Sequence, residues 1–153
     1  MLTPTGARVI EYNCRFGDPE TQVVLPLLET DLVDIIEAVW EEKLDTLDIK
    51  WSDKSCACVV MASGGYPEKY ETGKVISGLD ENGQSELAYV YHAGTKLEDG
   101  KFLTAGGRVL GVTATGDDLQ SALDKAYKAV ETIGFEKAHY RKDIGQRALN
   151  EMK

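Results

Sequence analysis

Basic residues are few in this sequence of 153 residues, and they form no continuous run. Lys and Arg number 17 against 26 Asp and Glu, so the formal net charge is -9 at pH 7. A surface of that sign repels a phosphate backbone, whose binding depends on lysine and arginine. The sequence therefore argues against nucleic acid as a partner.

Cysteine and long apolar runs are also scarce. The three cysteines, Cys14, Cys56 and Cys58, are odd in number and have apolar neighbours, which disfavours a disulfide framework and favours a reducing compartment. No run approaches the roughly 18 consecutive apolar residues of a membrane span, and the first residues lack the regions of a signal peptide. We therefore expect a cytoplasmic protein with no membrane partner.

The stretch from Ala7 to Phe16 alternates between polar and apolar residues with a period of two. This period predicts a strand, whose polar face carries Glu11, Asn13 and Arg15. Carboxylate and amide oxygens suit a magnesium ion, and a guanidinium beside them suits a phosphate or carboxylate. A half-buried strand with a solvated polar face explains the same pattern, so the spacing alone leaves both interpretations open.

A break follows at Gly17, where Asp18 is predicted to cap a helix that begins at Pro19. Capping also explains the acidic residue Glu20 in the first turn. Pro26 must end or kink this helix within two turns. A second, amphipathic helix is predicted after Thr30-Asp31, because apolar residues recur there at helical spacing: Leu32, Ile35, Ile36, Val39 and Trp40.

Strands dominate the pattern after residue 55. The run 56–62 is apolar on both faces, as in a buried strand. Further strands are predicted over 87–93 and 101–104, joined through a loop with Asp99-Gly100, and over 108–115.

A long apolar stripe at helical spacing follows the last of these strands. It predicts a helix capped by Asp117 and ended by Gly134, and a short helix is expected over 144–152. The chain is long enough to bury one hydrophobic core.

Several runs together resemble phosphoribosylamine–glycine ligase, also called glycinamide ribonucleotide synthetase. The first is EYNCRFGDPETQ at residues 11–22, followed by VVLP. The others are GGYP at 64–67, HAGT at 92–95, TAGGRVL at 104–110 and YRKDIG at 140–145. The resemblance covers essentially the whole chain, and it matches only the C-terminal part of that longer enzyme.

The resemblance implies a fold, a domain division and an activity. Residues 1–45 would be the end of an ATP-grasp core, a strand plus helices, and residues 46–153 a small β-rich α+β domain with a long packed helix. The activity implied is ATP-dependent joining of glycine to 5-phosphoribosylamine through a glycyl phosphate. The missing N-terminal and ATP-grasp parts would be its partners, so the chain alone is expected to be inactive and prone to self-association through exposed apolar surface.

The resemblance also implies roles for individual residues. Glu11 and Asn13 would bind Mg²⁺ or Mn²⁺ that bridges the phosphates of ATP, and Arg15 would stabilise the transferring phosphoryl group. Asp18 and Glu20 would lie on the substrate side. Two alternatives remain: a fragment of another ATP-grasp carboxylate–amine ligase, such as biotin carboxylase, or a non-catalytic interaction module.

Other residues have simpler structural interpretations. Cys56 and Cys58 lack a second pair at metal-ligand spacing, which favours buried apolar cysteines. His92 is expected to be a structural, hydrogen-bonding histidine rather than a general base. Arg108 follows two glycines that allow a close backbone approach, so it is a candidate for substrate binding and also for a structural salt bridge.

Overall fold

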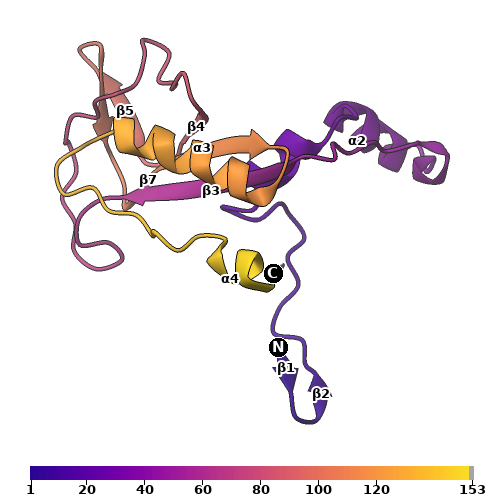
Figure 1. Cartoon of the computed structure of the whole chain (residues 1–153). Helices are drawn as coiled ribbons and strands as arrows, with labels where there is room; N and C mark the ends of the chain where they lie inside the picture. The colour runs from indigo at the N-terminus through magenta and orange to yellow at the C-terminus, as the bar shows by residue number, and fades with distance from the viewer. Residues whose placement is uncertain (152–153) are drawn as a thin grey trace.

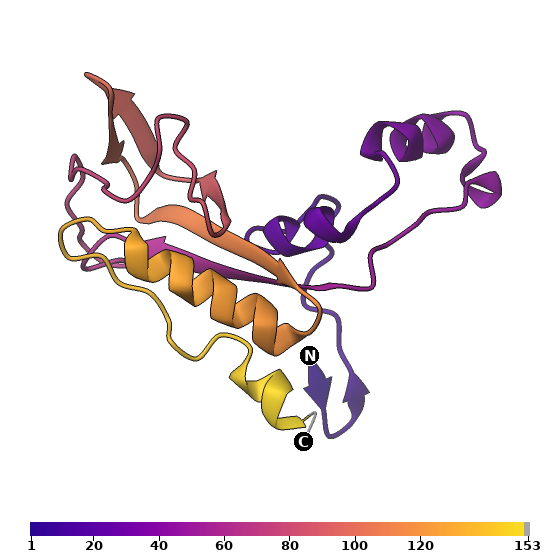
Figure 2. The ribbon, with the colours of Figure 1, turned by 45° about the horizontal axis from the view of Figure 1, so that its top comes forward.

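A three-stranded antiparallel sheet with one long helix across it forms the body of the protein (Figure 1). The computed structural model describes residues 1–151. In the sheet, β7 (Arg108–Gly116) lies between β3 (Ser55–Ala62) and β4 (Tyr89–His92). Helix α3 (Leu119–Thr132) covers one face, as Figure 2 shows from a second direction. The predicted α+β class is confirmed.

The core lies between this sheet and α3, because alternate strand residues point toward the helix. Val59 pairs with Val112, Met61 with Leu110, and Val90 with Val112 from the other side. All of these side chains are buried in one cluster with Ala126, Ala129 and Val130 of α3, whereas Ala122 and Leu123 of α3 pack with Ala57. Burial of this apolar surface is the main force that stabilises the fold.

The opposite face of the sheet is only partly covered. Cys56, Cys58 and Val60 alternate with the buried residues of β3 and remain partly exposed. The strand was expected to be buried on both faces, and that expectation is wrong, because only one face receives a long helix.

Helix α3 begins one residue later than predicted. Asp118, not Asp117, is its N-cap, and its carboxylate accepts a hydrogen bond from the Ser121 amide at 2.7 Å. The Ser121 side chain bonds back to the Asp118 amide, which completes a capping box. Asp117 and Asp118 are both suitable N-cap residues by sequence. Ser121 favours Asp118, because it lies three residues after it and can complete the capping box.

A two-stranded hairpin stands beside the sheet. It consists of β5 (Thr95–Glu98) and β6 (Lys101–Thr104), joined by Asp99 and Gly100, which both have positive φ. The predicted turn at Asp99 and Gly100 is confirmed. The predicted pairing of the strand over 87–93 with the strand over 101–104 is wrong, because β4 pairs with β7 instead. Strand β5 is exposed and short, so its residues carry little hydrophobic signal.

The tail returns across the protein after α3. Helix α4 (Gln146–Glu151) begins near the predicted position, and Met152 lies outside the described residues. Ile144 and Leu149 pack against the buried Leu123 of α3. Among residues 1–151, no helix combines the length and apolar character needed to cross a membrane.

Much of the first 50 residues extends away from the sheet (Figure 1), although residues 21–27 lie against β3. The first 50 residues contain a small hairpin of β1 (Leu2–Thr3) and β2 (Gly6–Ala7), then α1 (Thr21–Val24), η1 (Leu25–Leu27), α2 (Leu32–Trp40) and η2 (Leu44–Thr46). Helix α2 is confirmed, and its N-cap Asp31 accepts from the Val33 amide at 2.8 Å. Pro26 lies in the η1 turn that follows α1, as predicted. The division between residues 45 and 46 falls within η2 and stays a prediction.

The strand expected from Ala7 to Phe16 is wrong. Residues 8–16 belong to no helix or strand, and the side chains of Ile10 and Tyr12 are 71% and 81% exposed. A strand needs a neighbour to accept and donate its backbone hydrogen bonds; Arg8 still pairs with Met1, but no described residue pairs with the backbone of residues 9–16. The alternating sequence is therefore not sufficient to form a strand here.

Candidate functional site

The two candidate metal ligands lie next to each other on the exposed stretch. The Asn13 side-chain amide donates to the Glu11 carboxylate at 3.2 Å. Both side chains are exposed to solvent, and this is their only hydrogen bond in the described part of the chain. Glu11 and Asn13 are thus brought together as the sequence predicts.

The chemistry of this pair fits a hard divalent cation. Glu11 and Asn13 offer a carboxylate and an amide oxygen, which are ligands that Mg²⁺ accepts. Within residues 1–151, no group of three or more His, Cys, Asp or Glu is placed to hold a metal ion. The pair therefore fits an ion that takes its remaining ligands from water or phosphate, as Mg²⁺ at a nucleotide does.

Arg15 lies two residues further along and has no ion-pair partner among residues 1–151. Its guanidinium donates to the carbonyl of Phe16 at 3.2 Å, which leaves most of its donors toward solvent. A guanidinium with free donors and no neutralising carboxylate remains available to an anion.

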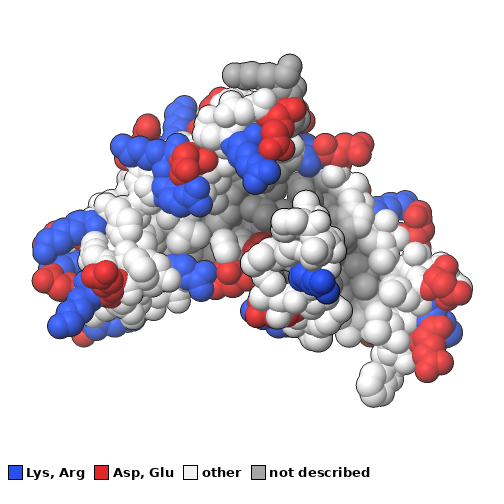
Figure 3. All heavy atoms as spheres, turned by 90° about the horizontal axis from the view of Figure 1, so that it is seen from below, with Lys and Arg blue, Asp and Glu red and all other residues white. Residues whose placement is uncertain are grey.

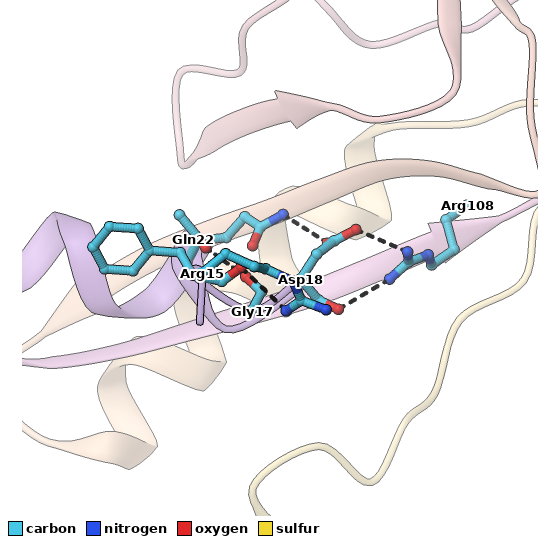
Figure 4. A network of polar contacts seen from close by, with 7 residues as sticks. Arg15, Gly17, Asp18, Gln22 and Arg108 are labelled. Atoms are coloured by element: carbon cyan, nitrogen blue, oxygen red, sulfur yellow. Dashed lines mark hydrogen bonds and ion pairs between the residues drawn. The ribbon is translucent and has the colours of Figure 1, made fainter. Parts of the chain in front are cut away.

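Asp18 is held by two residues from different parts of the chain (Figure 4). Its carboxylate lies 2.8 Å from Nη2 of Arg108, and the Arg108 guanidinium also donates to the Asp18 carbonyl at 3.3 Å. The Gln22 side chain donates to the other Asp18 oxygen at 3.0 Å. The predicted helix cap is therefore wrong, because the ion pair with Arg108 takes the carboxylate that would have capped the helix.

Glu20 takes the N-cap position of α1, whose first residue is Thr21, not Pro19, and its side chain forms no capping bond. Its carboxylate folds back over Gly17, where a Cβ would lie only 2.3 Å from Oε2. Glycine at position 17 therefore makes room for this carboxylate. The structure brings Asp18 and Arg108 together, whereas the Glu20 carboxylate lies against Gly17.

A small cavity of about 220 Å³ opens beside the Asp18–Arg108 pair. Gln22 and His92 contribute polar groups to its lining, beside apolar residues such as Val60 and Leu110. His92 uses both ring nitrogens, one with the Thr95 hydroxyl and one with the Gly83 carbonyl, each at 2.9 Å. The structural interpretation of His92 is therefore confirmed, because neither nitrogen is free for proton transfer.

A larger cavity of about 650 Å³ lies elsewhere on the open face of the sheet. Tyr89 and Tyr91, with ring centroids 4.7 Å apart, line it together with Leu25 and Pro26. It contains none of the site residues predicted from the sequence. Its size alone gives no chemistry, so the smaller cavity is the better candidate site.

The cysteines are all free. Burial raises the pKa of Cys56 to about 11, with a further contribution from Cys58, and burial also raises the pKa of Cys58. Thiols with such pKa values are protonated and unreactive at neutral pH. Cys56 and Cys58 were expected to be buried, but both are only partly buried, and Cys14 is exposed, against expectation.

Charges of both signs are interspersed on the face shown in Figure 3. Several basic side chains lie against acidic ones; for example, Lys74 lies 2.9 Å from Glu71 and 3.0 Å from Glu136. Such pairs neutralise one another locally, so these lysines are poor candidates for binding an anion.

The fold and the site together indicate the class of protein. The chain is an α+β domain preceded by an exposed segment that carries a carboxylate, an amide and a guanidinium, a set of groups suited to a metal-bound phosphate. The segment and the domain meet at Asp18 and Arg108.

Comparison with known proteins gives the family. Residues 56–147 match the family model described as "Phosphoribosylglycinamide synthetase, C domain". The chain therefore belongs to this family. A phosphoribosylamine–glycine ligase from Caldanaerobacter subterraneus subsp. tengcongensis is 53% identical over 144 residues, which are 94% of this chain and 34% of that protein. A ligase of the same name from Synechocystis is 52% identical, over 97% of this chain and 36% of its own length.

A solved structure agrees with these sequence matches. The crystal structure of phosphoribosylamine–glycine ligase from Thermotoga maritima has a TM-score of 0.72 and 33% identity, over 94% of this chain and 34% of that one. The trifunctional purine biosynthetic protein adenosine-3 of Gallus gallus is 51% identical over 97% of this chain, which is 15% of its own length. The chain thus spans about a third of the length of the ligases that it matches.

Gln22 and Tyr127 were missed as positioning residues from the sequence. Gln22 lies four residues after Asp18, which is a spacing that favours side-chain contact on a helix. This spacing was the one available signal. Tyr127 fits the apolar stripe of α3 by its spacing. The hydrogen bonds of its hydroxyl with Arg141 and Ile144 cannot be read from the sequence.

Proposed function

We propose that the chain is the C-terminal part of an ATP-dependent ligase that joins glycine to 5-phosphoribosylamine. The products are glycinamide ribonucleotide, ADP and phosphate, as in purine biosynthesis. The observation that carries this proposal is the exposed set Glu11, Asn13 and Arg15, attached to a domain of the synthetase family. The free cysteines support a reducing, cytoplasmic environment for it.

The reaction divides into two displacements. First, a glycine carboxylate oxygen attacks the γ-phosphorus of ATP, ADP leaves, and glycyl phosphate forms. Next, the amine nitrogen of phosphoribosylamine attacks the glycyl carbonyl carbon, phosphate leaves, and the nitrogen loses a proton. Negative charge develops on phosphate oxygens in both steps, on ADP as it leaves in the first and on phosphate as it leaves in the second, so fixed positive groups would provide most of the catalysis.

Each residue of the segment has a proposed part in this chemistry. Glu11 and Asn13 would hold Mg²⁺ or Mn²⁺, which neutralises charge on the ATP phosphates. Arg15 would place its free guanidinium donors on the transferring phosphoryl group or the acyl phosphate. Asp18 and Glu20 would lie at the substrate side of the turn, and Arg108 would border the same cavity.

The remaining parts of the enzyme are the proposed partners of the chain. Helix α2 exposes an apolar face that would pack on them, and in their absence a second copy of the chain would cover it. ATP binding would also depend on those parts, so the chain alone is expected to release no ADP.

A chimera tests the proposal. In the Caldanaerobacter ligase, the third that matches this chain is replaced by the chain, and ADP release that depends on glycine and phosphoribosylamine is measured. We expect an active chimera in which Glu11→Gln lowers kcat by about 100-fold or more. Glu131→Gln, an exposed carboxylate on α3, is the matched control and should leave activity unchanged.

Two outcomes would contradict the proposal. Full activity of the Glu11→Gln chimera would argue for a non-catalytic module, since a metal ligand does not tolerate that change. A folded chimera with no activity, beside an active parent enzyme, would argue for a different ligase substrate.

A further inference from the structure

The segment that carries Glu11, Asn13 and Arg15 has few attachments to the rest of the protein. In the described part of the chain, residues 9–16 form hydrogen bonds only within their own stretch. Their backbone pairs with no strand. Asp18 is the first residue after this stretch whose side chain bonds to the sheet, so the position of the segment depends on Asp18.

Arg108 holds Asp18 at two points. One Nη lies 2.8 Å from the carboxylate and the other donates to the Asp18 carbonyl at 3.3 Å. The side chain and the backbone of Asp18 are therefore both fixed by a single planar guanidinium. Gln22 takes the second carboxylate oxygen, which sets the rotation of the Asp18 side chain.

Arg108 itself has a rigid base. It is the first residue of β7, and it pairs with Ala62 of β3. A Cβ on Gly107 would meet the Tyr66 ring at 2.2 Å, and a Cβ on Gly94 would meet the Arg108 carbonyl at 2.5 Å. These two glycines let the neighbouring chains close around the Arg108 backbone, so the guanidinium projects from a fixed point of the sheet.

We infer that Arg108 is a positioning residue: through Asp18, it fixes the segment that carries Glu11, Asn13 and Arg15 onto the C-domain sheet. The consequence for catalysis rests on the proposed function, whereas the consequence for the segment does not. Both Nη groups of Arg108 are used by Asp18, so Arg108 acts on the segment rather than on a substrate anion. Its loss should release the segment without unfolding the sheet.

Limited trypsin digestion of the chain tests the structural part. Trypsin cuts after Arg15, and it must bind several residues on each side of that bond in an extended conformation. These residues include Asp18, so the contacts between Asp18 and Arg108 should slow cleavage. Arg108→Gln should raise the rate of cleavage after Arg15 about fivefold, the size expected for loss of an exposed ion pair. Cleavage after Arg8, beside the β1–β2 hairpin, serves as an internal reference.

A matched control and a rescue sharpen this test. Arg141→Gln removes a similar ion pair, with Asp143 at 2.8 Å, that joins residues only two apart. It should leave cleavage after Arg15 unchanged. The double variant Arg108→Asp with Asp18→Arg should restore slow cleavage. Equal cleavage in Arg108→Gln and Arg141→Gln would overturn the inference.

The chimera separates positioning from substrate binding. If Arg108 positions the segment, Arg108→Gln lowers kcat while KM for phosphoribosylamine stays within about twofold, and the charge-reversed pair recovers part of kcat. A raised KM with unchanged kcat, not rescued by reversal, would overturn the inference. Glu11→Gln tests the proposed function separately, because it should not alter cleavage after Arg15.

Discussion

The hydroxyl of Tyr127 on α3 donates to the carbonyl of Arg141 at 2.8 Å and accepts from the amide of Ile144 at 3.1 Å. One side chain thus closes the loop that leads from α3 to α4. The Tyr127 ring also lies against Tyr140, with ring centroids 6.3 Å apart. The run YRKDIG at 140–145 is therefore a docking segment for the tail, which gives a structural reason for its presence.

Tyr127→Phe should loosen this tail and leave the sheet intact. Two hydrogen bonds are lost, and the Arg141 carbonyl and the Ile144 amide lose their partner. Since a hydrogen bond contributes about 1 kcal/mol net, we expect the Ile144 amide to exchange about fivefold faster. Hydrogen exchange followed by NMR measures this directly.

Tyr89→Phe is the matched control for that change. Tyr89 is 58% exposed, and its hydroxyl makes no hydrogen bond within residues 1–151. Tyr89→Phe should therefore leave the exchange rate of the Ile144 amide unchanged. An unchanged rate in Tyr127→Phe would mean that packing of Ile144 and Leu149 holds the tail without the hydroxyl.

Local patterns predicted the elements whose partners lie nearby in the sequence or whose period is strong. Strands β3 and β7 and helix α3 have long apolar patterns, and each was expected close to its observed bounds. Strand β5 was missed because its residues are exposed. The order β3-β7-β4 was beyond prediction, since strand pairing depends on contacts between distant residues.

The candidate site shows the same limit. Glu11 and Asn13 are two residues apart, so their proximity follows from the sequence. Asp18 and Arg108 are separated by 90 residues, and their ion pair replaces the helix cap that local rules favour. Tertiary contacts took precedence over a local preference of about 1 kcal/mol.

Asp118 makes the stability of α3 depend on pH. The backbone hydrogen bond from Ser121 lowers the pKa of Asp118 from its ordinary value of 3.8. A lowered pKa means that the ionised carboxylate stabilises the folded state, fully above the unfolded value and less as pH falls below it. Asp118→Asn keeps a capping oxygen without the charge, so wild type should have the higher Tm at pH 6.

The difference in Tm between wild type and Asp118→Asn should shrink once the pH falls below about 3.8, where Asp118 takes up a proton. Thermal unfolding followed by circular dichroism over a pH series measures it. Asp117→Asn is the neighbouring control, because Asp118 is the N-cap. A difference that grows toward low pH would have the wrong sign for this cap.

Thiol labelling should find one fast cysteine. Burial raises the pKa of Cys56 to about 11, so roughly 0.1% of it is thiolate at pH 8, and Cys58 is shifted in the same direction. Cys14 is exposed and should react first with iodoacetamide, as counted by mass spectrometry. Cys14→Ser should remove the fast phase. A second fast thiol in the folded chain would contradict the shifted pKa values.

Helix α2 predicts that the isolated chain self-associates. Val33, Ile36 and Val39 are 57–58% exposed and Trp40 is 88% exposed, which is an uncovered apolar face. The net charge of -9 opposes association between copies, and salt screens this repulsion. Sedimentation velocity should therefore show larger species as protein or salt concentration rises.

Substitutions on α2 identify the contact. Ile36→Gln with Val39→Gln should leave the chain monomeric over the same concentrations, and its circular dichroism should be unchanged because both side chains are already exposed. Leu97→Gln, at a 63% exposed apolar residue of β5, makes a similar change elsewhere. If Leu97→Gln reduces association equally, the contact lies outside α2, and if wild type stays monomeric throughout, the exposed face does not bind a second copy.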